Sequence, residues 1–108
     1  ETIDKSIEIL SESQNSSILA LSKVENRFWY ENSPINHDYK TLYGTQYESP
    51  VYVEAGFYTF RKKEFLLEKS RIMESRITMH VDEVECVDID TKFDFAYAEA
   101  LVNSGLVT

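Results

Sequence analysis

The chain contains a single cysteine and no long apolar run. Because Cys86 is the only cysteine, no disulfide can form within the chain, and a reducing compartment is the expected environment. No apolar run approaches the length of a membrane span, and no basic segment followed by an apolar one opens the sequence. We therefore expect a cytoplasmic protein with no membrane partner.

Glycine and basic residues are also scarce. Gly44, Gly56 and Gly105 stand singly, so the sequence has no glycine-rich loop of the kind that cradles phosphates. The 11 Lys and Arg are outnumbered by 19 Asp and Glu, which gives a formal net charge of −8. Nucleic acids and anionic membranes bind to clustered basic residues, so this composition argues against both as partners. A single nucleotide needs only a local cation or a metal ion, so it stays open as a ligand.

The residues that are present predict one folded unit with alternating helices and strands. An apolar content of 43% and an aromatic content of 13% favour a single modest core over disorder. Residues 17–24 are apolar without alternation, which predicts a central strand buried on both faces of a parallel sheet. Residues 25–50 lose the pattern and should form a long excursion. Gly56 indicates a bulge or close backbone approach.

The full set of predicted elements alternates in type, which argues for part of an α/β layered sheet. We expect helices at 2–13 and 62–69, strands at 17–24, 51–60, 76–81 and 85–87, and a last helix that starts near 93 and ends before a C-cap at 103–105.

Asp88 and Asp90 are the residues that most directly indicate a metal-binding or catalytic site. They lie two residues apart where the strand at 85–87 should give way to a helix, and alternate residues of a strand point to the same side. The pair could therefore converge on one Mg²⁺, which takes one or two carboxylates, keeps several waters and accepts substrate phosphates. An alternative needs no metal: Asp88 closes a turn, Asp90 or Thr91 caps the helix, and Asp94 completes a capping box.

Three segments carry motifs that occur together in one enzyme family. Residues 87–99 contain VDIDT, DF and AE, similar to the IDIDT, xxDF and xxAE motifs that close that family. Residues 52–58, YVEAGFY, are similar to its ENGAFY or ETGAFY strand, and residues 3–10, IDKSIEIL, to its IDKAIELL helix. Further matches are LSKV at 21–24 in the place of SVSKV, FWY at 28–30 in the place of PYW, and Gln46 in the place of the glutamine of QDLP. Over essentially its whole length, the chain resembles the acylneuraminate cytidylyltransferase family.

This resemblance implies a fold class and a place within a larger enzyme. The implied fold is α/β, a partial doubly wound nucleotidyltransferase-like sheet with a protruding dimerisation segment at 25–50 that helps close the sugar pocket of a homodimer. Members of the family begin with a glycine-rich, basic loop that holds CTP, and nothing here is similar to it. We therefore expect residues 1–108 to be the C-terminal part of one cytidylyltransferase domain, inactive without the nucleotide-binding half.

The resemblance also implies a reaction and its residues. The anomeric hydroxyl of an acidic nine-carbon sugar, an acylneuraminate, would attack the α-phosphorus of CTP, which gives a CMP-sugar and pyrophosphate. Asp88 and Asp90 would be the catalytic, metal-binding residues for Mg²⁺ or Mn²⁺. Gln46 and Tyr58 would contact the sugar.

The sequence departs from the family pattern near the sugar pocket, and two other functions stay open. Gly44 and Thr45 replace an arginine that many members carry before the pocket glutamine, and Tyr47 replaces the aspartate that follows it. The sugar acid could therefore be a different one, such as 3-deoxy-manno-octulosonate or another nonulosonic acid. Alternatively, the chain is a non-catalytic homodimerisation or protein-interaction module, in which Asp88 and Asp90 are only caps.

Overall fold

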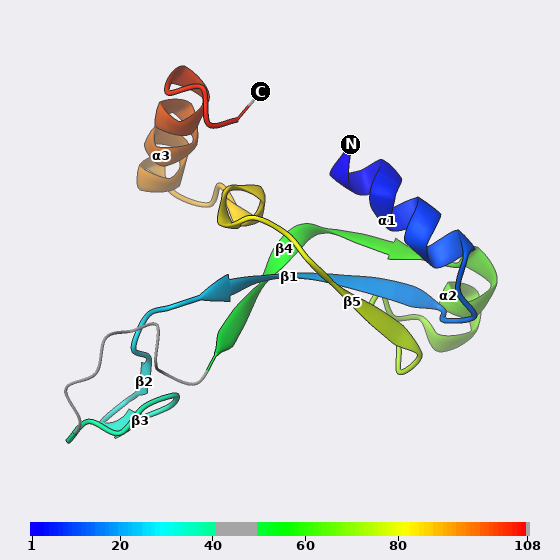
Figure 1. Cartoon of the computed structure of the whole chain (residues 1–108), viewed down its shortest axis with the longest axis horizontal. Helices are drawn as coiled ribbons and strands as arrows, with labels where there is room; N and C mark the ends of the chain where they lie inside the picture. Colours follow the sequence, from blue (N-terminus) through cyan, green and yellow to red (C-terminus); the bar gives the residue numbers. More distant parts are fainter. Residues whose placement is uncertain (41–49, 108) are drawn as a thin grey trace.

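The structure is a computed structural model that describes residues 1–40 and 50–107, and it is mixed α/β (Figure 1). Among the described residues, no helix combines the length and apolar character needed to span a bilayer. The elements in chain order are α1 Thr2–Ser11, β1 Ser17–Val24, β2 Trp29–Tyr30, β3 Ser33–Pro34, β4 Val51–Phe60, α2 Lys62–Glu68, β5 Arg76–His80, the 3₁₀ helix η2 Glu83–Cys86 and α3 Lys92–Asn103.

A three-stranded sheet with the order β4-β1-β5 forms the centre of the structure. The central position predicted for β1 is confirmed, but the expectation of a parallel sheet is only half right. β5 pairs with β1 in parallel, whereas β4 pairs with it antiparallel. The reason is the connection: β4 returns from the excursion directly beside β1, while β5 is reached only after the chain has passed through α2, and parallel neighbours need such a crossover.

A bulge interrupts the pairing of β4 with β1, as Gly56 predicted. Leu19 is opposite Tyr58 and Leu21 is opposite Glu54, so β4 uses four steps where β1 uses two. Extra residues of this kind bend a strand and redirect its side chains. Here the bulge places Glu54 and Tyr58 next to each other along β4.

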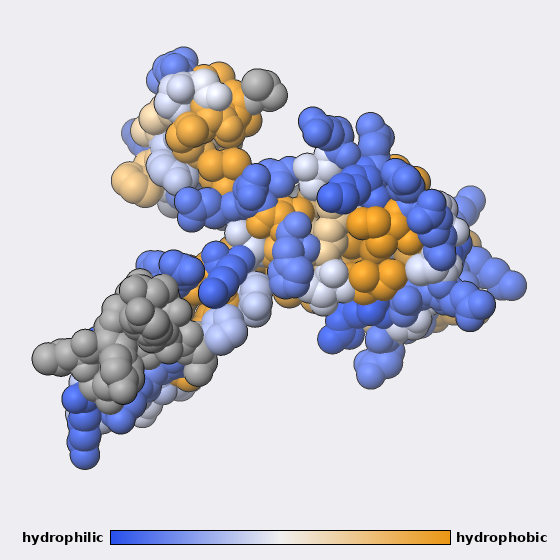
Figure 2. All heavy atoms as spheres, in the orientation of Figure 1, coloured by the Kyte–Doolittle hydropathy of each residue, from blue (hydrophilic) through white to orange (hydrophobic). Residues whose placement is uncertain are grey.

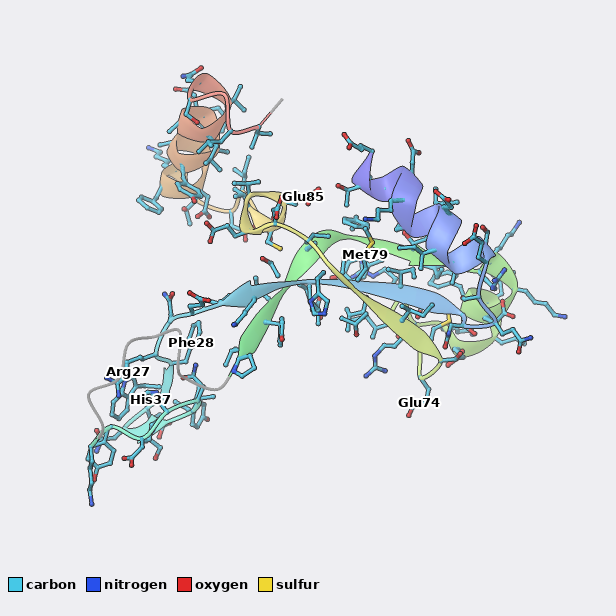
Figure 3. All side chains as sticks on the ribbon, viewed as in Figure 1. Arg27, Phe28, His37, Glu74, Met79 and Glu85 are labelled. Carbon is cyan, nitrogen blue, oxygen red and sulfur yellow. The ribbon has the colours of Figure 1, made fainter. Side chains whose placement is uncertain are left out.

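The core lies between α1 and one face of the sheet. Leu10 of α1 packs with Ile18 of β1 and Met79 of β5, all at most 8% exposed, and Figure 3 shows Met79 between the sheet and the helix. The Ser6 and Thr59 hydroxyls are hydrogen-bonded at 2.7 Å across the same interface. Because paired residues of neighbouring strands share a face, the opposite face carries Tyr58, Leu19 and Thr78 and is not covered by α1.

The predicted strand at 85–87 is wrong, because residues 83–86 form η2 instead. Two local hydrogen bonds close this turn: the Glu85 N–H donates to the Asp82 backbone carbonyl at 3.0 Å, and the Glu85 carboxylate accepts the Asp82 N–H at 3.3 Å. The Thr2 hydroxyl of α1 also donates to the Glu85 carboxylate. The bond from Thr2 links η2 to the start of α1, and η2 packs beside β1 and β4 without joining the sheet.

Two parts of the chain project from the sheet in Figure 1. One is the arm, residues 25–40, in which β2 and β3 pair antiparallel. Its turn is held by the buried Asn36 side chain, which accepts the Phe28 N–H and donates to the Asn26 carbonyl, both at 2.9 Å. The other is α3. The Cα radius of gyration is 16.9 Å, above the roughly 13 Å of a compact chain of this length.

Candidate functional site

The direction of the strands brings the candidate residues to one edge of the sheet. β1 and β5 run parallel, so their carboxyl ends lie at the same edge. The arm follows β1 there, and η2 with Asp88 and Asp90 follows β5. In α/β sheets, ligands bind in the crevice outside the carboxyl ends of the strands. The predicted carboxylates are therefore at the edge where such a site is normally built.

Asp88 and Asp90 lie in irregular backbone between η2 and α3, not in a strand. The prediction that the alternation of a strand points both carboxylates to the same side is therefore wrong. Both residues are exposed, and among the described residues no hydrogen bond or ion pair engages either carboxylate. The two side chains are thus accessible to an ion or a substrate from solvent.

The helix cap predicted as the metal-free alternative is confirmed, with Thr91 as the N-cap and Asp94 completing the capping box. The Thr91 hydroxyl accepts the Asp94 N–H at 3.1 Å, and the Asp94 carboxylate accepts the Thr91 N–H at 3.0 Å and the Asp90 N–H at 3.1 Å. These hydrogen bonds lower the pKa of Asp94, and the bond from the Asp90 amide has the largest effect. Asp90 contributes only its backbone N–H, so the cap does not engage its carboxylate or that of Asp88.

Tyr58 is the centre of a second group, the tyrosine cluster, made of Glu54, Tyr58 and Arg71. The Tyr58 hydroxyl donates to the Glu54 carboxylate at 2.6 Å, and the guanidinium carbon of Arg71 lies 4.4 Å from the centre of the Tyr58 ring. The hydrogen bond to Glu54 raises the pKa of Tyr58 most; burial and the negative charges of Glu54 and Asp88 add to it, and the Arg71 charge opposes it.

Of the four residues that the sequence singles out, Tyr58 lies in the tyrosine cluster, and Asp88 and Asp90 lie together in the exposed segment between η2 and α3. Gln46 lies outside the described residues. Sequence reasoning missed Glu54 and Arg71. Glu54 stands in the strand motif at 52–58, which was a usable signal, whereas no pattern marks Arg71, which follows α2 in an irregular loop.

The carboxylates of Asp88 and Asp90 suit Mg²⁺ or Mn²⁺ better than a metal ion that takes all its ligands from the protein. Within residues 1–40 and 50–107, no group of three or more His, Cys, Asp or Glu side chains is placed to hold an ion. Zinc in structural sites takes four protein ligands, so that chemistry does not fit here. Mg²⁺ accepts one or two carboxylates with waters and substrate phosphates, and the two exposed aspartates supply that many.

Comparison with known proteins adds no relative. No family model matches the chain, and no curated protein matches it either. Its function must therefore be inferred from its own motifs and geometry.

Proposed function

We propose that this chain is the C-terminal part of a cytidylyltransferase that transfers CMP from CTP to an acidic nine-carbon sugar. The observation that carries the proposal is the exposed Asp88 and Asp90 pair, which accepts no hydrogen bond from the described residues and sits in the VDIDT segment that resembles the acylneuraminate cytidylyltransferases. In this proposal the three-stranded sheet is one side of a doubly wound nucleotidyltransferase-like sheet, and the loop that binds CTP lies outside these 108 residues. The enzyme would work in the cytoplasm.

The proposal gives each residue of the site a role. Asp88 and Asp90 would hold Mg²⁺ or Mn²⁺, which when bound neutralises phosphate charge and aligns the reacting groups. Tyr58 lies on the sheet face that α1 leaves uncovered, and its hydroxyl is held by Glu54, so it would offer a fixed aromatic surface to the sugar. Gln46 would contact the sugar from the excursion. No covalent enzyme intermediate is needed.

A titration with Mn²⁺, observed by NMR, tests the metal site. Paramagnetic broadening should centre on residues 87–91, and a CTP analogue should tighten binding, because the phosphates supply further oxygen ligands. Asp88→Asn and Asp90→Asn should each weaken Mn²⁺ binding about tenfold or more. Glu99→Gln is the matched control, since Glu99 is an exposed carboxylate on α3, and it should bind as the wild type does. Equal binding by all four proteins, or broadening elsewhere only, would contradict the proposal.

One observation favours the second candidate, a homodimerisation or interaction module. α3 and the segment after it expose large apolar side chains that the rest of the described chain does not cover: Phe93 at 77%, Phe95 at 59% and Val102 at 60% exposed on α3, and Leu106 at 69% beyond its end. Figure 2 shows apolar surface on α3. Exposed apolar side chains gathered on one element are typical of an interface. The two candidates agree on a homodimer, and metal binding at Asp88 and Asp90 separates them.

The sugar acid is decided by product analysis. The proposal assigns an acylneuraminate, and 3-deoxy-manno-octulosonate or another nonulosonic acid are the competing substrates. The enzyme that contains this chain should form a CMP-sugar from its own substrate at least about tenfold faster, in kcat/KM, than from the others, since a misplaced polar group in a pocket costs this much.

A further inference from the structure

Arg71 is held in place by an anchored loop. The Ser70 hydroxyl donates to the Ile72 carbonyl at 2.7 Å and accepts the Ile72 N–H at 3.3 Å, which closes a tight turn around Arg71. Met73 follows, only 1% exposed, and its N–H donates to the Ser17 hydroxyl of β1 at 3.3 Å. The backbone of Arg71 is therefore fixed against the sheet although its side chain is exposed.

The guanidinium group of Arg71 contacts the ring of Tyr58. Its carbon lies over the ring, 4.4 Å from the centre, a cation–π contact that restricts where the group can lie. Among the described residues, no carboxylate lies within ion-pair distance of Arg71 and no acceptor is within hydrogen-bond reach. Arg61 and Arg76 differ, because both donate to main-chain carbonyls at 2.7 to 3.1 Å.

An accessible, pre-oriented arginine stands out in a chain of net charge −8. The excess of carboxylates repels anionic ligands in general, so a site for an anion needs a local cation that is not already neutralised. Among the described residues, Arg71 meets that need, and it contacts the Tyr58 ring. A cation and a held aromatic side chain therefore lie side by side on the sheet.

We infer that Arg71 binds the carboxylate of the acidic sugar and so sets the enzyme's preference for sugar acids over neutral sugars; this rests on the proposed function. The planar N–H fork of arginine matches a carboxylate with two parallel hydrogen bonds. The cation–π contact with Tyr58 supports the guanidinium group, and Glu54 holds Tyr58 through its hydroxyl. Arg71 touches the substrate but not the reacting bond, so it is a specificity residue.

Binding of N-acetylneuraminic acid and of its methyl ester to this chain, measured by NMR titration, tests the inference. The wild type should bind the acid about tenfold or more tightly than the ester, because the ester lacks the charged acceptor. Arg71→Gln should bind both ligands equally and weakly. Arg71→Lys should recover part of the preference, because it restores the charge without the fork. Lys63→Gln, which removes an exposed positive charge elsewhere on the chain, should behave as the wild type.

The outcomes separate this inference from the proposed function. If the ester binds as tightly as the acid, or if Arg71→Gln keeps the preference for the acid, Arg71 is not the carboxylate-binding residue, even where the Mn²⁺ titration succeeds at Asp88 and Asp90. If the wild type binds neither sugar, the inference also fails, and the Mn²⁺ result alone decides the proposed function. Circular dichroism of each variant shows whether a loss of binding reflects unfolding. If Arg71→Gln does not fold, Arg71→Lys still tests the role of the guanidinium group.

Discussion

Arg61 and Arg71 flank α2 and make different contacts, because Arg61 is half-buried and Arg71 is exposed. The half-buried Arg61 donates from Nε to the Asn15 carbonyl and from Nη2 to the carbonyls of Leu10 and Ser13, at 2.7 to 2.9 Å. These carbonyls lie at and just after the C-terminal end of α1, where backbone acceptors lack partners within the helix. Arg61 thus joins α1 to β4, whereas the exposed Arg71 makes no hydrogen bond to the described residues.

Replacing Arg61 should destabilise the fold. Arg61→Gln cannot reach all three carbonyls, so the free energy of unfolding should fall by about 2 to 3 kcal/mol, the usual contribution of hydrogen bonds to a charged group. Denaturation by urea, followed by circular dichroism, measures this. The neighbouring exposed Lys62 gives the control: Lys62→Gln should change stability by no more than about 0.5 kcal/mol. Equal stability of the two variants would show that the Arg61 contacts contribute nothing.

At the scale of the element, α3 depends on its N-terminal cap because it has little else to hold it. Most of its apolar side chains are exposed, and only Leu101 is buried. Helices of this length are marginal in water without tertiary packing. The hydrogen bonds between Thr91 and Asp94 therefore matter more here than in a helix packed against a core.

Loss of the cap should loosen α3 alone. Thr91→Ala removes the acceptor for the Asp94 N–H, which costs about 1 kcal/mol, so amides in the first turns of α3 should exchange with solvent roughly fivefold faster. Hydrogen exchange read by NMR measures this, and the amides of β1 serve as the internal reference because they should not change. Equal acceleration in β1 would mean that the cap stabilises the whole fold.

The same cap predicts a pH dependence. Hydrogen bonds from Asp90 and Thr91 lower the pKa of Asp94 in the folded chain, so the unfolded state binds the proton more readily. The stabilisation is therefore complete above the ordinary aspartate pKa, about 3.9, and is lost as the pH falls through the lower folded value. Helical exchange protection in α3 should drop over this acidic range in the wild type. Asp94→Asn should show no such step, and a step that persists in it would assign the effect to another carboxylate.

At the scale of the whole molecule, the projecting arm and α3 make the chain extended, with principal extents of 47 × 35 × 23 Å (Figure 1). Buried apolar side chains are few among the described residues: Leu10, Ile18, Ala20, Ala55, Met73, Met79 and Leu101. An extended chain with a small core and exposed apolar helical surface gains free energy by association.

The chain should therefore self-associate through α3. Sedimentation equilibrium should show a mass that rises with concentration toward a dimer. Phe93→Ser should weaken the association, because Phe93 is 77% exposed in the single chain and its removal costs no core packing. Lys92→Ser, at the neighbouring position on the helix, is the control that should leave association unchanged. A monomer at all concentrations, or equal effects of both variants, would contradict this role for α3.

The sequence by itself determined the local structure. β1 and β4 have the predicted bounds, the bulge occurs at Gly56, and Thr91 with Asp94 forms the predicted cap. These features depend on residues within a few positions of one another, through apolar runs, backbone freedom and side chain to backbone hydrogen bonds. The DEVE segment at 82–85 carries a similar capping signal, which favours the helical turn η2. The strand prediction for 85–87 gives more weight to the apolar residues that follow and is wrong for that reason.

Only the tertiary structure decided how distant segments meet. The antiparallel direction of β4, the contacts of Arg61 with the end of α1, and the stacking of Arg71 on Tyr58 each join residues that no local pattern relates. The exposure of Asp88 and Asp90 also follows from the path between η2 and α3 rather than from their spacing. Such contacts arise when loops close and faces pack, and those free energies depend on the whole chain rather than on any one segment.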